Sequence, residues 1–492
     1  MSTATAVHTA GTIGSIQGTG RAAAQGTGAE TAAKEQEVRI SERDRIRREQ
    51  CLNDTMWKVV LQIGTPLALY QLLTQVFSVI DTMIASQISA ESVSAVSFLT
   101  QINQILSAVG GGLAVGAGIQ ISIAYGKGDY RMVKRRVSTL YAMALGIGLV
   151  MLACILPFTG PFLRLAGTPE SLIRIGSSYF TVQLFSMVIV FMNNVYIAVE
   201  RARGNSGRIM ALNMIVIAVK TSLTVLFVYV LKGDLVMIAA ATLISQAVLL
   251  CFAVRYSMAG KDAFSFSTHA ITKDKETCSP MISKSIPVVT ERALFAFGKS
   301  IVNSMSTVYG DLMVGALGVS NNLSGVATIP LNGYQEGAAS VIGQNFGAGK
   351  YRRVLEAFYA ALVINVLLGA TISGAELLNL NLIAASFAKE NAEFHRLILV
   401  TAKADLLCAI PLGVNAAVLG LLYGLGKNRL TLVLNFMRVF IFRIPLFWAM
   451  QHLTSLGERS VGLMMLISNG SAGVMAAIAA FFVIREYRKK YL

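Results

Sequence analysis

The stretch PLALYQLLTQVFSVIDTMIAS, residues 66–86, is apolar enough for a membrane-spanning helix, yet it contains an ionisable residue, Asp81. A carboxylate at membrane depth costs ~3 kcal/mol on insertion scales, so such a residue usually serves a function. Polar side chains at helical spacing lead up to it on one face: Gln71, Thr74, Gln75 and Ser78. This pattern predicts that Asp81 faces a cavity or a helix bundle, and that Gln71, Gln75 and Ser78 line the cavity.

The composition places the whole chain in a membrane. Of its 492 residues, 54% are hydrophobic and only 14% are charged, whereas soluble domains carry about 25% charged residues. Apolar runs long enough to span a bilayer recur along the chain, which predicts an all-α polytopic membrane protein. The net charge of +16 comes from cations in short loops between these runs. This distribution is typical of membrane proteins, and we expect no nucleic-acid partner.

Several function classes are disfavoured by what the sequence lacks. The five cysteines have no pair spacing, so neither a disulfide framework nor a zinc site is expected. No nucleotide-binding motif is present, and ATP is therefore not the expected energy source. We expect neither an enzyme nor a cofactor or bound metal.

Twelve spans are predicted, in two lobes of six. They are placed near residues 57–86, 92–124, 135–158, 171–199, 208–231, 235–256, 286–309, 313–345, 353–378, 397–423, 429–450 and 461–484. The expected organisation is a disordered, then charged cytoplasmic segment (1–56, of which 37–56 is partly helical), an N-terminal lobe (57–257), a cytoplasmic inter-lobe loop (258–285), a C-terminal lobe (286–484) and a basic cytoplasmic tail (485–492). Gly110, Gly111 and Gly112 are the expected weak point of the long second span.

The distribution of Lys and Arg predicts the orientation. The loops after the second, fourth, sixth and eighth spans are rich in cations, as is the C-terminal tail, whereas the intervening loops are poor in them. Cytoplasmic loops of membrane proteins carry this excess, so both termini are expected in the cytoplasm.

The chain also repeats itself. YGKGDYRMV at 125–133 corresponds to FGAGKYRRV at 346–354, and Pro66 corresponds to Pro287, both with a shift of 221 residues. ARGNSGRIMALN at 202–213 corresponds to YGLGKNRLTLVLN at 423–435, with Gly204 matching Gly426 and Asn213 matching Asn435 at a shift of 222. Six spans per half give both halves the same orientation. They should therefore be related by an axis along the membrane normal, with a substrate site between them.

At these residues the chain resembles the multidrug and toxic compound extrusion (MATE) family of transporters, prokaryotic type. The matching stretches are VIDTMIAS at 79–86, IAYGKGDYRMV at 123–133, IGQNFGAGKYRRV at 342–354 and LGKNR at 425–429. The resemblance implies twelve helices in two lobes, plasma-membrane location and alternating access. It also implies antiport of cationic or amphipathic drugs against protons or sodium, with Asp81 as the first-helix acid of the N-terminal lobe.

One departure from the family concerns the cation site beside Asp81. The family commonly has Asn-x-x-x-Asp in the fifth helix, where this chain has Lys220 and Thr224; the sixth-helix threonine is retained as Thr242. Lys220 either faces inward and pairs with Asp81, or extends its ammonium along the helix towards the membrane surface. A tethered ammonium beside Asp81 would occupy the place of a mobile cation. We therefore expect protons rather than sodium as the coupling ion.

Charged residues also fall within the expected helices of the second lobe. Glu291, Glu336 and Lys299 form either a second proton or substrate site or structural ion pairs, in which Arg292 or Lys299 is the cation.

Other charged residues of this lobe are read as structural. Lys403 and Asp405 are expected as a pair on the outer surface. Arg438 and Arg443 are expected to anchor the eleventh helix.

Two functions remain open at this point. The first is a secondary active exporter of cationic or amphipathic small molecules, acting as a monomer among membrane lipids. The alternative is a flippase or exporter of lipid-linked or anionic precursors, which needs cations facing the cavity. Lys220 and Lys299 favour the alternative, whereas Asp81, Glu291 and Glu336 oppose it.

Overall fold

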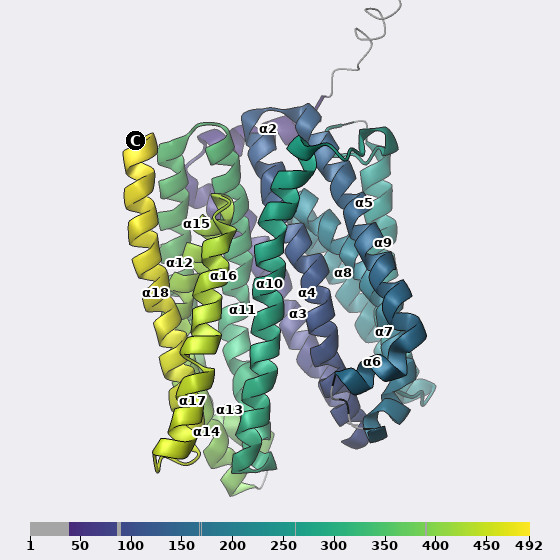
Figure 1. Ribbon diagram of the computed structural model, residues 1–492, viewed down its shortest axis with the longest axis vertical. Coiled ribbons are helices and arrows are strands. Elements are labelled where there is room, and N and C mark those ends of the chain that lie inside the picture. The colour runs from purple at the N-terminus through teal and green to yellow at the C-terminus, as the bar shows by residue number, and fades with distance from the viewer. Residues whose placement is uncertain (1–38, 86–89, 167, 169, 261, 389–390) are drawn as a thin grey trace, which may run out of the picture. The chain divides into compact units, whose positions relative to one another are not determined.

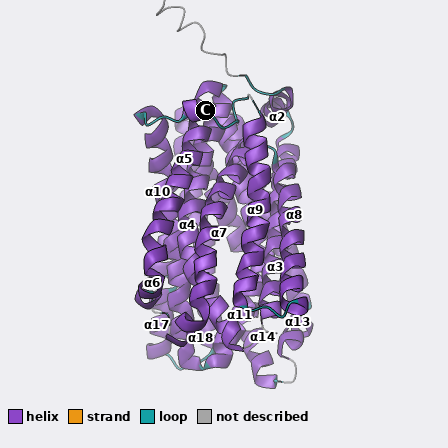
Figure 2. Ribbon diagram, turned by 90° about the vertical axis from the view of Figure 1, so that its right-hand side faces the viewer, coloured by secondary structure: helices purple, strands orange, loops and turns teal. Residues whose placement is uncertain are grey.

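The structure is a computed structural model that describes residues 39–85, 90–166, 168, 170–260, 262–388 and 391–492. Within the helices, the side chains of residues 78–85, 90–98, 101, 171, 172, 175 and 311 are not described. The expected disorder of residues 1–36 lies outside the described residues. Residues 40–492 form one compact unit, and its described part consists of helices and the turns between them, with no strand (Figure 2).

The first half of the unit begins with a short helix, followed by the spans of the N-terminal lobe (Figure 1). Its helices are α2 Glu42–Asn53, α3 Met56–Ala85, α4 Ala90–Lys127, α5 Tyr130–Ile155, α6 Thr159–Leu165, α7 Glu170–Ala202, α8 Ser206–Val225 and α9 Leu235–Ala259. A π-helical turn, η2 Leu226–Val230, extends α8. The helix α2 agrees with the partly helical segment expected at residues 37–56.

The second half repeats this order. Its helices are α10 Lys275–Ser306, α11 Asp311–Gly347, α12 Tyr351–Leu378, α13 Leu380–Ala388, α14 Ala392–Leu406, α15 Ala409–Gly424, α16 Asn428–Phe436, α17 Ile444–Leu453 and α18 Arg459–Tyr491. The π-helical turn η5 Met437–Ile441 lies between α16 and α17. Short 3₁₀ turns are formed by Leu156–Phe158, Thr268–Ala270 and Thr307–Tyr309.

The number of spans agrees with the expectation. Ten of the described helical segments are long and apolar enough to cross a membrane, and the bent pair α14 and α15 adds an eleventh. The more polar α10 runs beside them along the same axis and is the twelfth (Figure 1).

Several boundaries differ from those expected. The inter-lobe loop is shorter than 258–285, because α10 begins at Lys275. Most of the expected tail, 485–492, is helical, since α18 continues to Tyr491. The tenth span is interrupted between Leu406 and Ala409, where the helix bends by 43°. The expected weak point in α4 is not a break, because the helix is continuous through Gly110–Gly112.

The sequence repeat appears in the backbone. Gly128 and Gly349, which are 221 residues apart, have positive φ angles of 80° and 73°. Gly204 and Gly426, which are 222 apart, have φ angles of 76° and 68°. Because only glycine adopts this region readily, the same residue is required at equivalent turns of both halves.

The two halves meet most closely near the end of the bundle that carries α2 and the C-terminus, here called the α2 end. A Cβ on Gly126 of α4 would lie 2.0 Å from the Gln344 carbonyl oxygen of α11, and a Cβ on Gly347 of α11 would lie 2.1 Å from the Ile123 carbonyl oxygen of α4. Gly126 and Gly347 are 221 positions apart, as are Ile123 and Gln344, so the two contacts are equivalent under the repeat. The two long helices therefore cross about the pseudo-twofold axis without intervening side chains.

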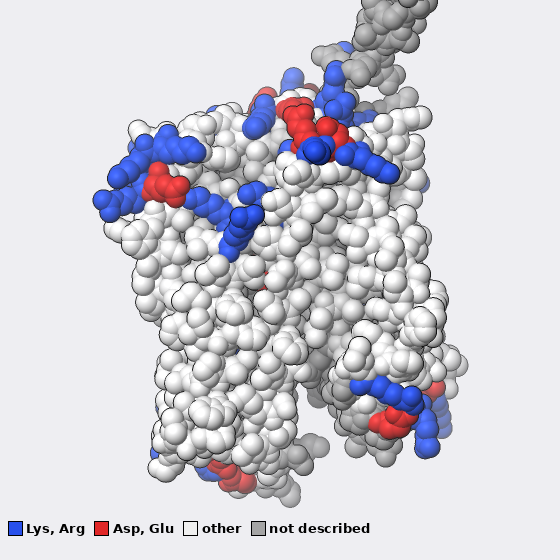
Figure 3. All heavy atoms as spheres, in the orientation of Figure 1, with Lys and Arg blue, Asp and Glu red and all other residues white. Residues whose placement is uncertain are grey.

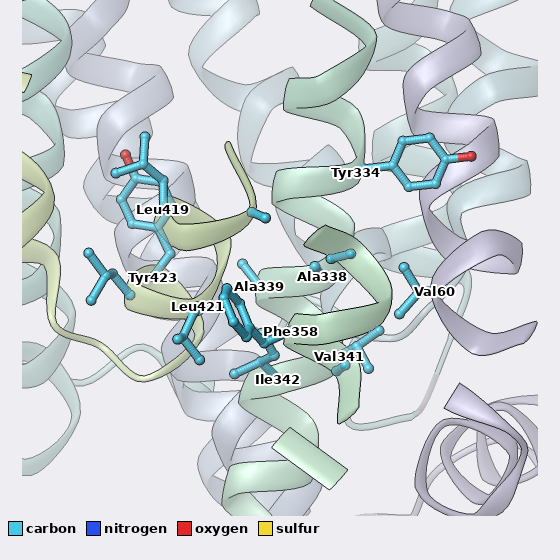
Figure 4. Packing of buried hydrophobic residues seen from close by; sticks show 14 of the residues in the cluster. Val60, Tyr334, Ala338, Ala339, Val341, Ile342, Phe358, Leu419, Leu421 and Tyr423 are labelled. Carbon is cyan, nitrogen blue, oxygen red and sulfur yellow. The ribbon is translucent and has the colours of Figure 1, made fainter. Parts of the chain in front are cut away.

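The apolar core follows the same division. One large cluster towards the α2 end combines residues of both halves, including Val60 of α3 with Tyr334, Ala338 and Val341 of α11 (Figure 4). Two other clusters each lie within one half: one contains Leu99, Phe180 and Leu235, and the other contains Val302, Leu397 and Phe447. The halves thus share a core at the α2 end and separate towards the opposite, far end.

The helix α2 ties both halves together. Arg48 donates to the carbonyls of Tyr125 and Gly126 in the first half, at 3.0 and 2.8 Å. Arg353 of the second half donates to the carbonyl of Asp54, just past α2, at 2.6 Å. The short helix therefore lies across the tightest crossing of the bundle.

A second contact between α2 and the first half is ionic. Arg203 forms ion pairs with Glu200 at 3.1 Å, with Asp262 at 3.2 Å and with Asp44 of α2 at 3.6 Å. Burial alone would lower the pKa of Arg203, but the three carboxylates raise it above its ordinary value.

We expect Gly126→Ala to lower the thermal midpoint of the purified protein. The added methyl group meets a backbone carbonyl that no rotamer change can move, and overpacking of this kind costs roughly 1–3 kcal/mol. Gly146→Ala in α5 is the matched control, because a Cβ there meets nothing within 4 Å. A midpoint that is equal in the two variants would contradict the proposed tight crossing.

Candidate functional site

A cavity of about 850 Å³ lies between the two halves. Its walls come from α3, α4 and α7 on one side and from α10, α11, α14, α15, α16, η5 and α18 on the other. Arg443 also lines the cavity and lies immediately before α17. The space-filling view shows the molecule hollowed between the halves at its far end (Figure 3). Gln71 and Gln75 line the cavity, as do Glu291, Glu336 and Lys299.

Glu336 lies where the two halves touch. Its carboxylate forms ion pairs with Arg201 of α7 in the first half and with Arg292 of α10 in the second, the latter at 3.2 Å. The Arg201 side chain is only 7% exposed, so its charge depends on this partner. Of the two readings that the sequence left open for Glu336, the geometry favours the ion pair, with Arg201 as an additional partner across the interface.

Glu291 has a different environment. Its buried carboxylate accepts hydrogen bonds from the Tyr423 hydroxyl at 2.8 Å, the Thr431 hydroxyl at 2.6 Å and the Asn435 amide at 2.7 Å. Among the described residues it forms no ion pair, even though Arg292 is its neighbour in the sequence. Burial opposes the ionised form of this carboxylate, whereas the three donors favour it. Both readings of Glu291, a protonation or substrate site and a structural residue, therefore stay open.

A third group of charged residues lines the cavity further towards the far end. The set called the basic cluster comprises Lys299 of α10, Arg438 of η5, Arg443 before α17, Asp405 of α14 and Asn469 of α18. The Asn469 amide oxygen accepts from both Arg438 and Arg443 at 2.6 Å, and its amide nitrogen donates to Asp405 at 2.7 Å.

The structure corrects the expectation for Asp405. It is 2% exposed and faces the cavity, whereas Lys403 is exposed, so the two do not form a pair on the outer surface. The reason is the break after Leu406, which occurs four residues before Pro411. A proline lacks the N–H for the fourth carbonyl before it, so the helix is interrupted there and the cavity gains a buried acid.

The N-terminal candidates are only partly described. The side chains of Asp81 and Ser78 lie outside the described residues, and the pairing of Asp81 with Lys220 therefore stays a prediction. Lys220 is half-buried on α8, Thr224 is buried one turn further on, and the Thr242 hydroxyl donates to the Ile238 carbonyl at 3.2 Å. The described cavity lining contains no residue of α8 or α9.

Sequence reasoning missed several residues of the site. Arg201 was counted among the loop cations that set the orientation, although it lies in the last turn of α7. Asn435 was used only to align the repeat. Tyr423 and Thr431 carry no charge, and they are too far from Glu291 in the sequence for helical periodicity to link them to it. Pro411 and Pro445 could have indicated further site residues near them in the sequence. Both prolines predict interrupted helices, which often form transporter binding sites.

The fold and the site define a class of protein: a membrane transporter with two halves in the same orientation and a polar cavity between them. A family model described as MatE matches residues 66–229 and 287–449. The chain therefore belongs to the MATE family of multidrug efflux transporters and, as expected, is a transporter rather than an enzyme.

Two bacterial proteins are among the relatives of this chain. The probable multidrug resistance protein YpnP of Bacillus subtilis (strain 168) is 24% identical over 303 residues, which cover 60% of this chain and 66% of the relative. The multidrug export protein MepA of Staphylococcus aureus (strain NCTC 8325 / PS 47) is 23% identical over 300 residues with the same coverage. The matched region thus spans 66% of the length of each relative.

Solved structures share the fold. A MOP superfamily transporter from Pyrococcus furiosus, whose binding pocket is described as having reverse polarity, superimposes with a TM-score of 0.85 at 18% identity. The match covers 92% of this chain and 99% of that one.

We expect Glu336→Gln to lower the stability of the purified protein by about 3–5 kcal/mol, because it leaves the buried Arg201 without a counter-charge. Thermal unfolding in detergent is the measurement. Glu458→Gln is the control, since Glu458 pairs with Arg396 on the exposed surface, where ion pairs contribute little. An unchanged midpoint in Glu336→Gln would show that the pair is not structural.

Proposed function

We propose that this chain is a secondary active exporter that moves cationic or amphipathic drug-like molecules out of the cell by alternating access, driven by proton influx. Sodium is the less favoured coupling ion. The proposal includes a monomer in the plasma membrane with both termini in the cytoplasm. The gathering of Lys and Arg towards the α2 end supports this orientation (Figure 3).

One observation carries the proposal: the cavity is lined by both halves, and among the described residues the core that the halves share lies at the α2 end. A molecule that enters the cavity touches both halves at once, so its binding can act on their relative position. The reciprocal glycine contacts and α2 then form the closed side of an exporter that is open to the far end.

Coupling is assigned to one acid in each half. Asp81 is the proposed coupling group of the N-terminal half, with Lys220, Thr224 and Thr242 around it. Glu291 is the proposed coupling group of the C-terminal half. Three donors already point at the Glu291 carboxylate. A sodium ion would need these groups to turn and offer oxygens, whereas a proton needs only one carboxylate oxygen.

A second candidate function is export of lipid-linked or other anionic precursors. It is favoured by the charges of the described cavity lining, which includes five cations (Arg201, Arg292, Lys299, Arg438 and Arg443) and three acids (Glu291, Glu336 and Asp405). A solved neighbour in fold is likewise described as having a pocket of reverse polarity and a different function.

Export itself is tested in cells that lack their own drug exporters. Cells producing the chain should accumulate less of an exported dye than control cells, and the difference should vanish when the proton gradient is collapsed. Collapsing the sodium gradient alone should leave export unchanged. Export that persists without a proton gradient and fails without a sodium gradient would refute the proposed coupling ion.

The two coupling acids are tested by neutral replacement. Asp81→Asn and Glu291→Gln should each reduce proton-driven export at least about tenfold, because neither amide can take up and release a proton. Both variants should still bind the dye when purified. Gln104→Glu, which adds an acid to the side of the cavity opposite Glu291, is a control for nonspecific charge effects. Export at the unmodified rate in a folded Glu291→Gln protein would assign coupling to the other half.

A further inference from the structure

We propose that the basic cluster is a binding site for an anionic group, a carboxylate, sulfonate or phosphate, carried by the transported organic molecule. This inference rests on the proposed export through the cavity and names a feature of the substrate. It also places that feature: Lys299, Arg438 and Arg443 bind the anionic group in the C-terminal half, towards the far end.

The charge excess of the cavity is local. Around Glu336 and Glu291, two arginines face two acids, so that region is balanced. The basic cluster has three cations and one acid, Asp405. The whole excess of two positive charges in the described lining therefore lies in this cluster, and the low-dielectric walls of the cavity focus its field.

The cations of the cluster are not neutralised by carboxylates. In the described part of the chain, none of Lys299, Arg438 and Arg443 lies within ion-pair distance of an acid. Lys299 is exposed to the cavity. It lies within electrostatic range of Arg438, Arg443 and Asp405. The Arg438 Nε atom is buried and has no hydrogen-bond partner among the described residues. Cations that line a cavity and that no carboxylate neutralises favour an anion from outside.

The backbone adds to the positive potential. The helix α15 begins at Ala409 after the 43° bend, and α17 begins at Ile444 directly after Arg443. Helix N-termini carry a partial positive charge and free N–H groups. Both interruptions belong to the second half. In the first half, the helix equivalent to α14 and α15 is α7, which is continuous.

The surroundings fit an organic anion better than an inorganic one. The Arg438 guanidinium lies over the Phe295 ring, 5.2 Å from its centroid, and Phe295, Leu412 and Met465 line the adjacent wall. Guanidinium groups match planar oxyanions, and an aromatic wall accommodates an apolar body. The ligand class is therefore an amphiphile with an anionic head group.

The test compares two xanthene dyes of similar shape and opposite charge: fluorescein, which carries a carboxylate, and tetramethylrhodamine ethyl ester, which is cationic. Fluorescence anisotropy with the purified full chain in nanodiscs gives both dissociation constants. Fluorescein should bind saturably, and Lys299→Gln should weaken it at least about tenfold. Lys299→Glu should abolish fluorescein binding and strengthen binding of the cationic dye. Lys299 forms no hydrogen bond or ion pair among the described residues, so both variants should fold.

Lys403→Gln is the matched control, because Lys403 is exposed on the same lobe and does not line the cavity. It should bind both dyes like the unmodified chain. Absence of saturable fluorescein binding, or equal binding in Lys299→Gln, overturns the proposal. So does thermal stabilisation by inorganic phosphate that depends on Lys299 while fluorescein does not bind, since the site would then hold a free ion. Lys299-dependent binding without export in cells would instead refute the proposed function alone.

Discussion

The arrangement of the whole protein depends on the reciprocal contact between α4 and α11 at Gly126 and Gly347. At both positions a backbone carbonyl of the other half fills the space that a side chain would need. The contact brings the two halves together at the α2 end, where their apolar residues merge into one core. Because the halves are rigid bundles with separate cores at the far end, closing one end leaves the other apart. The cavity is thus a consequence of where the glycines lie.

The two halves have the same backbone turns at equivalent positions, but different side chains at the positions that face the cavity. A shift of 221 or 222 residues relates the turns and the crossing glycines, yet it relates Glu291 to Tyr70 and Tyr423 to Arg201. At the first pair of equivalent positions, one half has an acid and the other a phenol. At the second pair, one half has a phenol and the other a guanidinium. Backbone contacts across a pseudo-twofold axis must match on both sides, whereas side chains facing the cavity have no such restriction. This freedom allows Glu291 and the basic cluster of the second half to have no counterpart of the same chemistry in the first half.

This distinction also decides what could be predicted from the sequence. The spans, the repeat and the glycine turns were predictable, because they depend on periodicity and on local backbone conformation. The pairing of Glu336 with Arg201 was not, since 135 residues separate the two and only the packing of α7 against α11 brings them together. Asp405 was placed on the wrong surface because its helix was read as continuous. Pro411 signalled the break, but only the three-dimensional position of the break turns Asp405 into the cavity.

Alternating access requires the contacts at the α2 end to be exchangeable at small net cost. The polar contacts of α2 meet this requirement in part, since water can replace hydrogen bonds such as those of Arg48 and Arg353, whose charged donors contribute about 1.5–3 kcal/mol each. The shared apolar core does not meet it alone, because its exposure costs about 25 cal/mol for each Å². Closing the far end must therefore bury a comparable apolar area between the halves. Because the residues of the basic cluster all belong to the second half, a substrate proposed to bind there would favour this closure only through contacts that its apolar body makes with the first half.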